Sequence, residues 1–214
     1  MIRTAKKKQA RRRPPKFDLT AGVVCLDFVN TLDDRFKTEQ KELLKDYVDV
    51  ARFAEDTGIL PAHAVDRLMA LSQASPAQTQ KALAAAVQLR EAIFEVFWAH
   101  LKKKSVPAAA LFTLNQYVQV AAQHLKLTPV NGHYEFRFEE ASNNLEAPLW
   151  PIARAAGELL ASEQLEFVRA CASEACQWLF LDSSKNHRRR WCDMKQCGNR
   201  AKARAFYERE KKDN

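Results

Sequence analysis

Four of the five cysteines in the 214-residue chain lie close together near its C-terminus. Cys171 and Cys176 form one pair and Cys192 and Cys197 a second, with four residues inside each pair and fifteen between the pairs. Each short pair turns two thiolates towards one point, and the loop between the pairs brings the second pair to face the first. This spacing predicts one tetrahedral Zn²⁺ site per chain, bound by these four residues.

The alternatives to zinc are four unrelated thiols or two disulfide bonds. Disulfides are typical of secreted proteins, and the N-terminus lacks the apolar core of a signal peptide. Because four protein ligands complete a tetrahedral site, the zinc is expected to be structural, not catalytic. His187 is a spare ligand nearby, and we expect it to be solvent-exposed or to contact phosphate. The isolated Cys25 is expected to be a small buried hydrophobe.

Basic residues surround the second cysteine pair. Residues 185–212 contain eleven Lys and Arg residues and three acidic residues, and the alanine-rich stretch after Cys197 predicts a helix. Arginine makes bidentate contacts with phosphates and guanines, so this composition favours nucleic-acid binding over a merely solvated amphipathic helix. The predicted nucleic-acid-binding residues are Arg188, Arg189, Arg190, Asn199, Arg200, Lys202, Arg204 and Arg209.

The N-terminus is also basic, whereas the middle of the chain is acidic. Residues 1–16 contain eight Lys and Arg residues and no acid, while residues 17–184 carry a net charge of −7. Such asymmetry is expected where polyanion binding is confined to dedicated segments and the charge of the core keeps it off the polyanion. The first segment lacks hydrophobic periodicity and predicts a disordered basic arm over residues 1–16, a composition that also fits a transit peptide or a nuclear address.

Most of the remaining sequence predicts helices, in keeping with five glycines and 47% hydrophobic residues. Apolar residues recur at helical spacing over 43–56, 61–72, 76–101 and 148–160 and in the segment that starts at Pro107. Gly58 is a candidate C-cap, and Ser75-Pro76 predicts a helix start. The pair Asn131-Gly132 within residues 125–138 predicts a β-hairpin.

Two other stretches predict strands. The apolar run over residues 19–32 predicts a strand or hairpin that leads into the first helix. Residues 177–182 and 187–191 predict two short strands joined by residues 183–186, which would place Arg189 on the opposite side from its two neighbours. The fold class is therefore mainly α with small β-hairpins: a helical N-terminal domain followed by a C-terminal treble-clef-like or ribbon-like zinc finger.

The run from Cys176 to Lys202 resembles the bacterial CGNR zinc-finger family, which is named for the tetrapeptide Cys197-Gly198-Asn199-Arg200. Upstream, Cys25-Leu-Asp-Phe-Val-Asn-Thr31 is similar to the signature of the ABATE domain, which usually precedes that finger. The resemblance covers nearly the whole chain after residue 17 and implies a stress-related transcription regulator with a DNA-binding finger. The expected domains are a disordered basic arm over 1–16, an ABATE-like helical domain over 17–165 and a CGNR-type finger over 166–212.

Three polar residues, Asp27, Asn30 and Thr31, interrupt the otherwise apolar run. One interpretation is a site through which the helical domain senses a small molecule. The other is local: a buried carboxylate and amide that bond to the backbone at a turn. The five histidines are scattered along the chain, so no nucleophile, base and orienting group can be assembled from the sequence, and an enzyme is not expected.

These observations together predict a zinc-dependent DNA-binding regulator. Its helical domain would sense an effector of unknown identity or form a homodimer, and its place would be the cytoplasm, in association with the nucleoid. The alternatives are an RNA-binding protein and an interaction adaptor whose basic finger docks on an acidic protein. No membrane partner is expected, since no stretch approaches the roughly 18 apolar residues of a membrane span.

Overall fold

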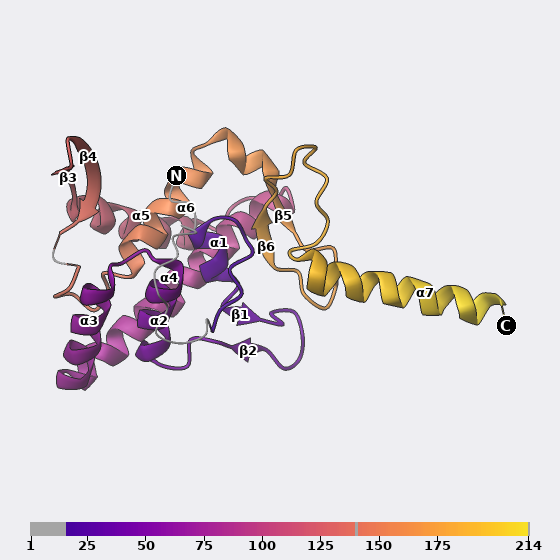
Figure 1. The fold of residues 1–214 in the computed structure, drawn as a ribbon, viewed down its shortest axis with the longest axis horizontal. Coiled ribbons are helices and arrows are strands. Elements are labelled where there is room, and N and C mark those ends of the chain that lie inside the picture. The colour runs from indigo at the N-terminus through magenta and orange to yellow at the C-terminus, as the bar shows by residue number, and fades with distance from the viewer. Residues whose placement is uncertain (1–15, 140, 214) are drawn as a thin grey trace.

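The computed structural model describes residues 16–139 and 141–213 of the chain (Figure 1). Except for Lys16, the predicted basic arm over residues 1–16 therefore lies outside the described residues. The backbone N–H of Lys16 donates to Asp56 Oδ2 at 2.9 Å, and its Nζ pairs with the carboxylate of Asp49. The described chain thus begins on the surface of the second helix.

Six helices build the described part of the region from residue 17 to residue 165, which we call the helical region. They are α1 (Val24–Val29), α2 (Tyr47–Thr57), α3 (Ala62–Ala74), α4 (Pro76–Leu101), α5 (Ala108–Gln123) and α6 (Leu149–Leu160). The long helix α4 is central and packs against α1, α2, α3, α5 and α6. Among the described residues, no helix combines the length and the apolar character that crossing a membrane requires.

Local chemistry sets several of these boundaries as predicted. Gly58 ends α2 in the left-handed conformation, with φ of 70°. Pro76 occupies the first turn of α4, although the side chain of Ser75 makes no capping hydrogen bond. Strands β3 (Leu125–Val130) and β4 (His133–Phe138) pair in antiparallel fashion around Asn131 and Gly132, whose φ values of 47° and 82° suit a tight two-residue turn.

Within the apolar run over residues 19–32, residues Val24–Val29 form the helix α1, so the predicted strand or hairpin is wrong. All six residues of α1 are buried, because α1 packs against α4, α6 and the strand β6 (Leu179–Leu181). An element that is covered on every side gives an uninterrupted apolar pattern whether it is a helix or a strand. Only Leu32 and Asp33 after it form a short strand, β1, which pairs with β2 (Lys41–Glu42).

The region from residue 166 to residue 212, which we call the finger region, begins within the 3₁₀ helix η1 (Glu163–Phe167). It contains β5 (Val168–Ala170), β6, the π-helical turn η2 (Met194–Gly198) and the helix α7 (Asn199–Asp213). Figure 1 shows α7 projecting from one end of the molecule and the β3–β4 hairpin lying at the other.

The predicted pairing of residues 177–182 with residues 187–191 is also wrong. β6 pairs with β5, and its other edge is covered by the helical region, where Leu181 N donates to Ala21 O at 2.8 Å. Both edges of β6 are therefore used, which leaves residues 187–191 no edge to join. They wrap instead around Asp182, whose Oδ2 accepts a hydrogen bond from Arg189 N at 2.8 Å.

Candidate metal centre and basic surface

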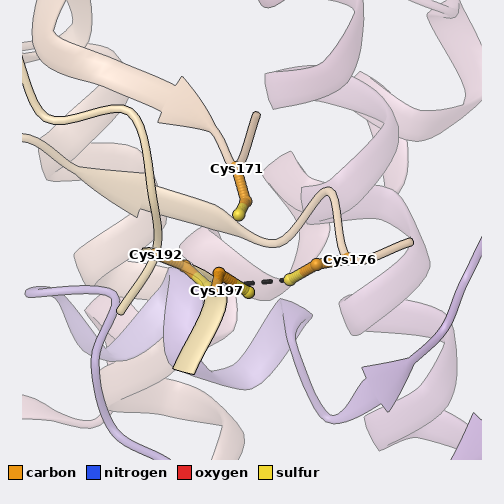
Figure 2. Close-up of side chains that lie close together, drawn as sticks. All are labelled: Cys171, Cys176, Cys192 and Cys197. Atoms are coloured by element: carbon orange, nitrogen blue, oxygen red, sulfur yellow. Dashed lines mark hydrogen bonds between the residues drawn. The ribbon is translucent and has the colours of Figure 1, made fainter. Parts of the chain in front are cut away.

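The four cysteines of the finger region converge on one point (Figure 2). Their Sγ atoms all lie within 4.8 Å of one another, with 3.6 Å between Cys176 and Cys192 and 3.7 Å between Cys192 and Cys197. In a tetrahedral site with Zn–S bonds of about 2.3 Å, the sulfurs are about 3.8 Å apart. Four soft thiolates at this spacing fit Zn²⁺ in both donor type and geometry.

Backbone hydrogen bonds hold each cysteine pair in its turn. Cys171 follows β5 and donates its N–H to Trp178 O at 2.8 Å, while Cys176 N donates to Ser173 O at 2.9 Å. The second pair lies at the start of a helix, where Asp193 Oδ1 accepts a hydrogen bond from Lys195 N and caps η2. One pair between two strands and one pair leading into a helix correspond to the treble-clef alternative.

Each residue of the tetrapeptide Cys197-Gly198-Asn199-Arg200 has a local structural role. A Cβ at Gly198 would lie 2.4 Å from Met194 Sδ, so a larger residue at this position would require the exposed Met194 side chain to move. Asn199 Nδ2 donates to Lys195 O at 3.1 Å and closes the π-helical turn. Arg200 Nη2 lies 3.4 Å from Cys197 Sγ and brings a positive charge to the ligand sulfur.

The crowding of sulfurs changes their acidity. Hydrogen bonds from the thiols of Cys176 and Cys192 lower the pKa of Cys171, and the same contact with Cys171 raises the pKa values of its two partners. Several thiolates this close repel one another unless a cation lies among them. The cluster is therefore built for a divalent ion, which allows all four sulfurs to be ionised together.

The finger region is joined to the helical region by polar contacts that imitate a sheet. Asn30 Nδ2 donates to Leu179 O at 2.9 Å, and Asn30 Oδ1 accepts from Leu179 N at 3.0 Å. The amide of Asn30 thus takes the place of a neighbouring strand residue beside β6. A third contact runs from Trp178 Nε1 to Asp33 Oδ1 at 2.9 Å.

The two other polar residues of this run also form internal hydrogen bonds. Asp27 Oδ1 accepts from Ala21 N at 2.9 Å, and Thr31 Oγ1 donates to Phe28 O at 2.6 Å. Asp27, Asn30 and Thr31 are all buried. This geometry favours their structural interpretation, and a ligand site at these residues stays a prediction.

The predicted nucleic-acid-binding residues fall into two groups by exposure. Arg188, Arg190, Asn199, Arg200, Lys202, Arg204 and Arg209 are exposed, whereas Arg189 is only partly exposed. The Arg189 side chain donates to the carbonyls of Trp191, Thr20 and Cys192, and its guanidinium lies 4.5 Å from the centre of the Phe180 ring. Residues 187–191 form no strand, so the predicted strand alternation does not set Arg189 apart from its neighbours; its side chain instead holds the finger together through these contacts.

Two further residues bear on the expectations for this site: the link through Trp178 was not expected, whereas His187 is solvent-exposed as expected. Trp178 links the two regions through Asp33, which no sequence motif indicates. His187 stacks on Phe167 with 3.8 Å between ring centres, and its Nδ1 lies 2.8 Å from Asp182 O, so the ring is occupied by the loop and is separate from the four-cysteine cluster. Cys25 is a fully buried thiol, and burial raises its pKa, as expected of an unreactive core residue.

Comparisons with known proteins identify both regions. The family model ABATE, described as "Putative stress-induced transcription regulator", matches residues 22–163, and the model described as "CGNR zinc finger" matches residues 168–210. A search of curated proteins gave no matching sequence. Both matching families are of regulator or zinc-finger type and not of enzymes. The chain therefore belongs to the ABATE family, and its C-terminal region is a CGNR zinc finger that binds one structural zinc ion through Cys171, Cys176, Cys192 and Cys197.

Proposed function

We propose that this regulator binds duplex DNA through α7 and the loop that contains Arg188 and Arg190. The observation that carries this proposal is the position of α7, which projects into solvent from the metal centre (Figure 1). Among the described elements, α7 packs extensively only on η2. A helix of about 22 Å that leaves most of its surface unpacked is marginal alone, so it is suited to a partner that covers it.

The chemistry of α7 indicates a polyanionic partner. Lys202, Arg204 and Arg209 are exposed along its length. The exposed rings of Phe206 and Tyr207 lie among these charges, at 52% and 63% exposure. Basic residues interleaved with aromatic residues are typical of surfaces that contact phosphates and bases.

Some of the basic residues are free to contact nucleic acid, whereas others also stabilise the finger region. We assign nucleic-acid contacts to Lys202, Arg204 and Arg209 on α7 and to the exposed Arg188 and Arg190. Those two arginines line a shallow hollow of about 280 Å³ with Trp191 and Met194. Asn199, Arg200 and Arg189 also hold the finger together, so their substitution would combine a loss of contact with a loss of structure.

The helical region fixes the direction of α7, because Asn30 and Asp33 hold β6 and Trp178. In this proposal it is the region that dimerises or responds to an effector, and the regulator acts on the nucleoid in the cytoplasm. Both assignments depend on DNA binding and are tested after it.

The test is a competition measured by fluorescence anisotropy on the zinc-loaded full chain. Labelled duplex DNA is displaced with unlabelled duplex DNA, with RNA and with polyglutamate, each at two salt concentrations. We expect duplex DNA to compete best. Stronger competition by RNA, or by polyglutamate, would replace the proposal with RNA binding or with an adaptor function.

Single substitutions then locate the contacts. Arg204→Ala should cost about 1–3 kcal/mol of binding free energy on a preferred duplex if the side chain reads a base. Lys81→Ala, an exposed lysine on α4, is the matched control and should leave binding unchanged. Equal losses on every duplex would show that Arg204 contacts only phosphate.

A further inference from the structure

A basic cleft lies between the two regions, where the C-terminal end of α4 meets η1 and β5. Its volume is about 450 Å³. Leu101, Val106 and Val168 form the apolar part of its lining. This volume leaves room for a small organic molecule and exceeds what a single ion needs.

Basic side chains form the rest of the lining. His100, Lys103, Lys104 and Arg169 line the cleft, with Glu166 as the single carboxylate. Three permanent cations against one acid stand out here, because residues 17–184 together carry a net charge of −7. The cleft is therefore a local positive region on an acidic body, and it attracts anions.

The end of α4 holds two lysines at this cleft. Lys103 adopts the left-handed conformation with φ of 52°, and Lys104 N donates back to Ala99 O at 2.9 Å, which ends the helix in a tight turn. The neighbouring Lys102 is directed elsewhere, since its Nζ lies 4.4 Å from the centre of the Trp98 ring. Of the three consecutive lysines, Lys102 therefore lies against Trp98, whereas Lys103 and Lys104 line the cleft.

Arg169 adds a guanidinium whose orientation is fixed. Its Nη1 donates to Glu166 O and to Val168 O, the latter at 2.9 Å. A guanidinium has five N–H donors in a rigid fork, so donors beyond Nη1 can serve an anion. A planar cation held by backbone carbonyls beside two lysines is a pattern suited to a phosphate group.

We propose that this cleft binds a nucleotide, with its phosphate against Lys103, Lys104 and Arg169 and its base over the apolar lining. The nucleotide is either free or part of a nucleic-acid strand. The second source rests on the proposed function, because it requires that the finger region binds DNA.

The position of β5 supports the second source, a nucleotide within a nucleic-acid strand. Arg169 pairs across the sheet with Phe180, whose ring lies under the guanidinium of Arg189. Directly opposed residues of two strands point to the same face, so Arg169 lies on the face of the sheet that carries the Phe180 side chain. Ala172 N donates to Arg190 O at 2.8 Å, which places the finger loop beside the end of β5. A nucleic-acid strand bound at Arg190 is therefore close to β5, which leads to the cleft.

The first experiment measures binding of adenosine monophosphate to the zinc-loaded full chain by calorimetry, with adenosine and inorganic phosphate for comparison. Lys104→Glu should weaken adenosine monophosphate by about tenfold, since it reverses one of the charges that face the phosphate. Glu166→Gln should strengthen binding, because it removes the single carboxylate. Lys81→Glu, the same charge change at the other end of α4, is the control and should have no effect. Matching melting curves show that each variant is folded.

The second experiment measures duplex binding by the same variants. If adenosine monophosphate does not bind but Lys104→Glu weakens duplex binding more than Lys81→Glu does, the cleft binds a nucleotide of the nucleic-acid strand. Binding of adenosine monophosphate that is unchanged in Lys104→Glu overturns the proposal. So does the absence of nucleotide binding together with equal duplex losses in the two lysine variants. If the wild type binds no duplex, the proposed function fails, and the nucleotide titration alone decides the cleft.

Discussion

The helical region buries large apolar side chains from six helices, whereas the finger region has a much smaller share of the core and four thiolates at its centre. Phe53, Phe97 and Leu89 are fully buried in the former. In the latter the buried apolar side chains are mainly those of β6, and they lie against α1. A segment of fewer than 50 residues cannot bury enough apolar surface to fold alone, so a metal and a neighbouring surface stabilise it instead.

The two regions stabilise each other to different extents. The helical region gains part of its cover from β6, but the finger region receives a sheet edge, a hydrogen-bonding amide and a carboxylate from residues 21–33. Because these contacts are directional, they fix the orientation of the finger. Breaking each kind of support should therefore damage the two regions to different extents.

The largest effect should follow loss of the metal. Zinc binding to finger peptides is worth about 10–16 kcal/mol, so Cys192→Ser should release zinc and unfold the finger region. The helical region should stay folded but melt at a lower temperature, since α1 loses the cover of β6. Elemental analysis and circular dichroism measure both changes. Cys25→Ala, at the cysteine outside the cluster, is the control and should keep one zinc; a finger still protected from hydrogen exchange in the zinc-free variant would contradict the prediction.

Next in size is the apolar core of the helical region. Phe53 contacts Phe17 and Phe28, each with 5.3 Å between ring centres, and Phe53→Ala should cost about 3–5 kcal/mol of unfolding free energy. The folded variant should still bind one zinc. Phe206→Ala on the exposed face of α7 is the matched control, with an expected change within about 0.5 kcal/mol. Similar losses in urea denaturation for both variants would remove the distinction between the regions.

A smaller effect is expected where the regions meet. Asn30→Ala leaves the N–H and the carbonyl of Leu179 without their partner, and each buried unpaired group costs about 1–3 kcal/mol. We expect a total loss of about 2–4 kcal/mol and faster hydrogen exchange at the Leu179 amide, with zinc retained. Asn115→Ala at an exposed position of α5 is the control. Unchanged exchange at Leu179 would show that β6 does not need the amide.

The smallest effect concerns pH. Burial raises the pKa of Glu91, but the hydrogen bonds and positive charges of Arg35 and Arg90 lower it by more, so the net shift is downward. The folded state then binds this proton less readily than the unfolded state, and the associated stability is present above the ordinary pKa of about 4.3 and disappears as the pH falls through the folded pKa.

Glu91→Gln should therefore remove part of the acid sensitivity of the helical region. Since the side chain of Glu91 is 35% exposed, solvent screening limits the effect to about 0.5–1 kcal/mol. Denaturation of wild type and Glu91→Gln at pH values on both sides of about 4.3, the ordinary glutamate pKa, measures this effect. Zinc release on acidification affects both proteins equally and cancels in the comparison. Glu95→Gln on the same helix is the control. An identical loss of stability on acidification in wild type and Glu91→Gln would reject the assignment.

Features with a local physical cause could be predicted from the sequence. Asn131-Gly132 specifies its turn, Gly58 ends a helix, and Pro76 begins one, because each acts through its own backbone. The metal ligands could be predicted for the same reason, since each pair lies within one turn.

Features that depend on distant contacts could not be predicted. The burial of α1 on all sides made its pattern ambiguous between helix and strand. The partner of β6 was missed because Ala21 and Asn30 occupy its second edge, and both lie about 150 residues away in sequence. Nothing in the order of residues 177–191 records that this edge is already taken.

The amide of Asn30 that stands in for a strand residue has a consequence for exchanging parts between relatives. The two family matches suggest a cut between residues 163 and 168. Such a cut would separate β6 from the amide that pairs with Leu179, and Trp178 from Asp33. A chimera that gives this protein another finger should therefore import the donor's counterpart of residues 18–33 as well. The transplantable unit is discontinuous in sequence.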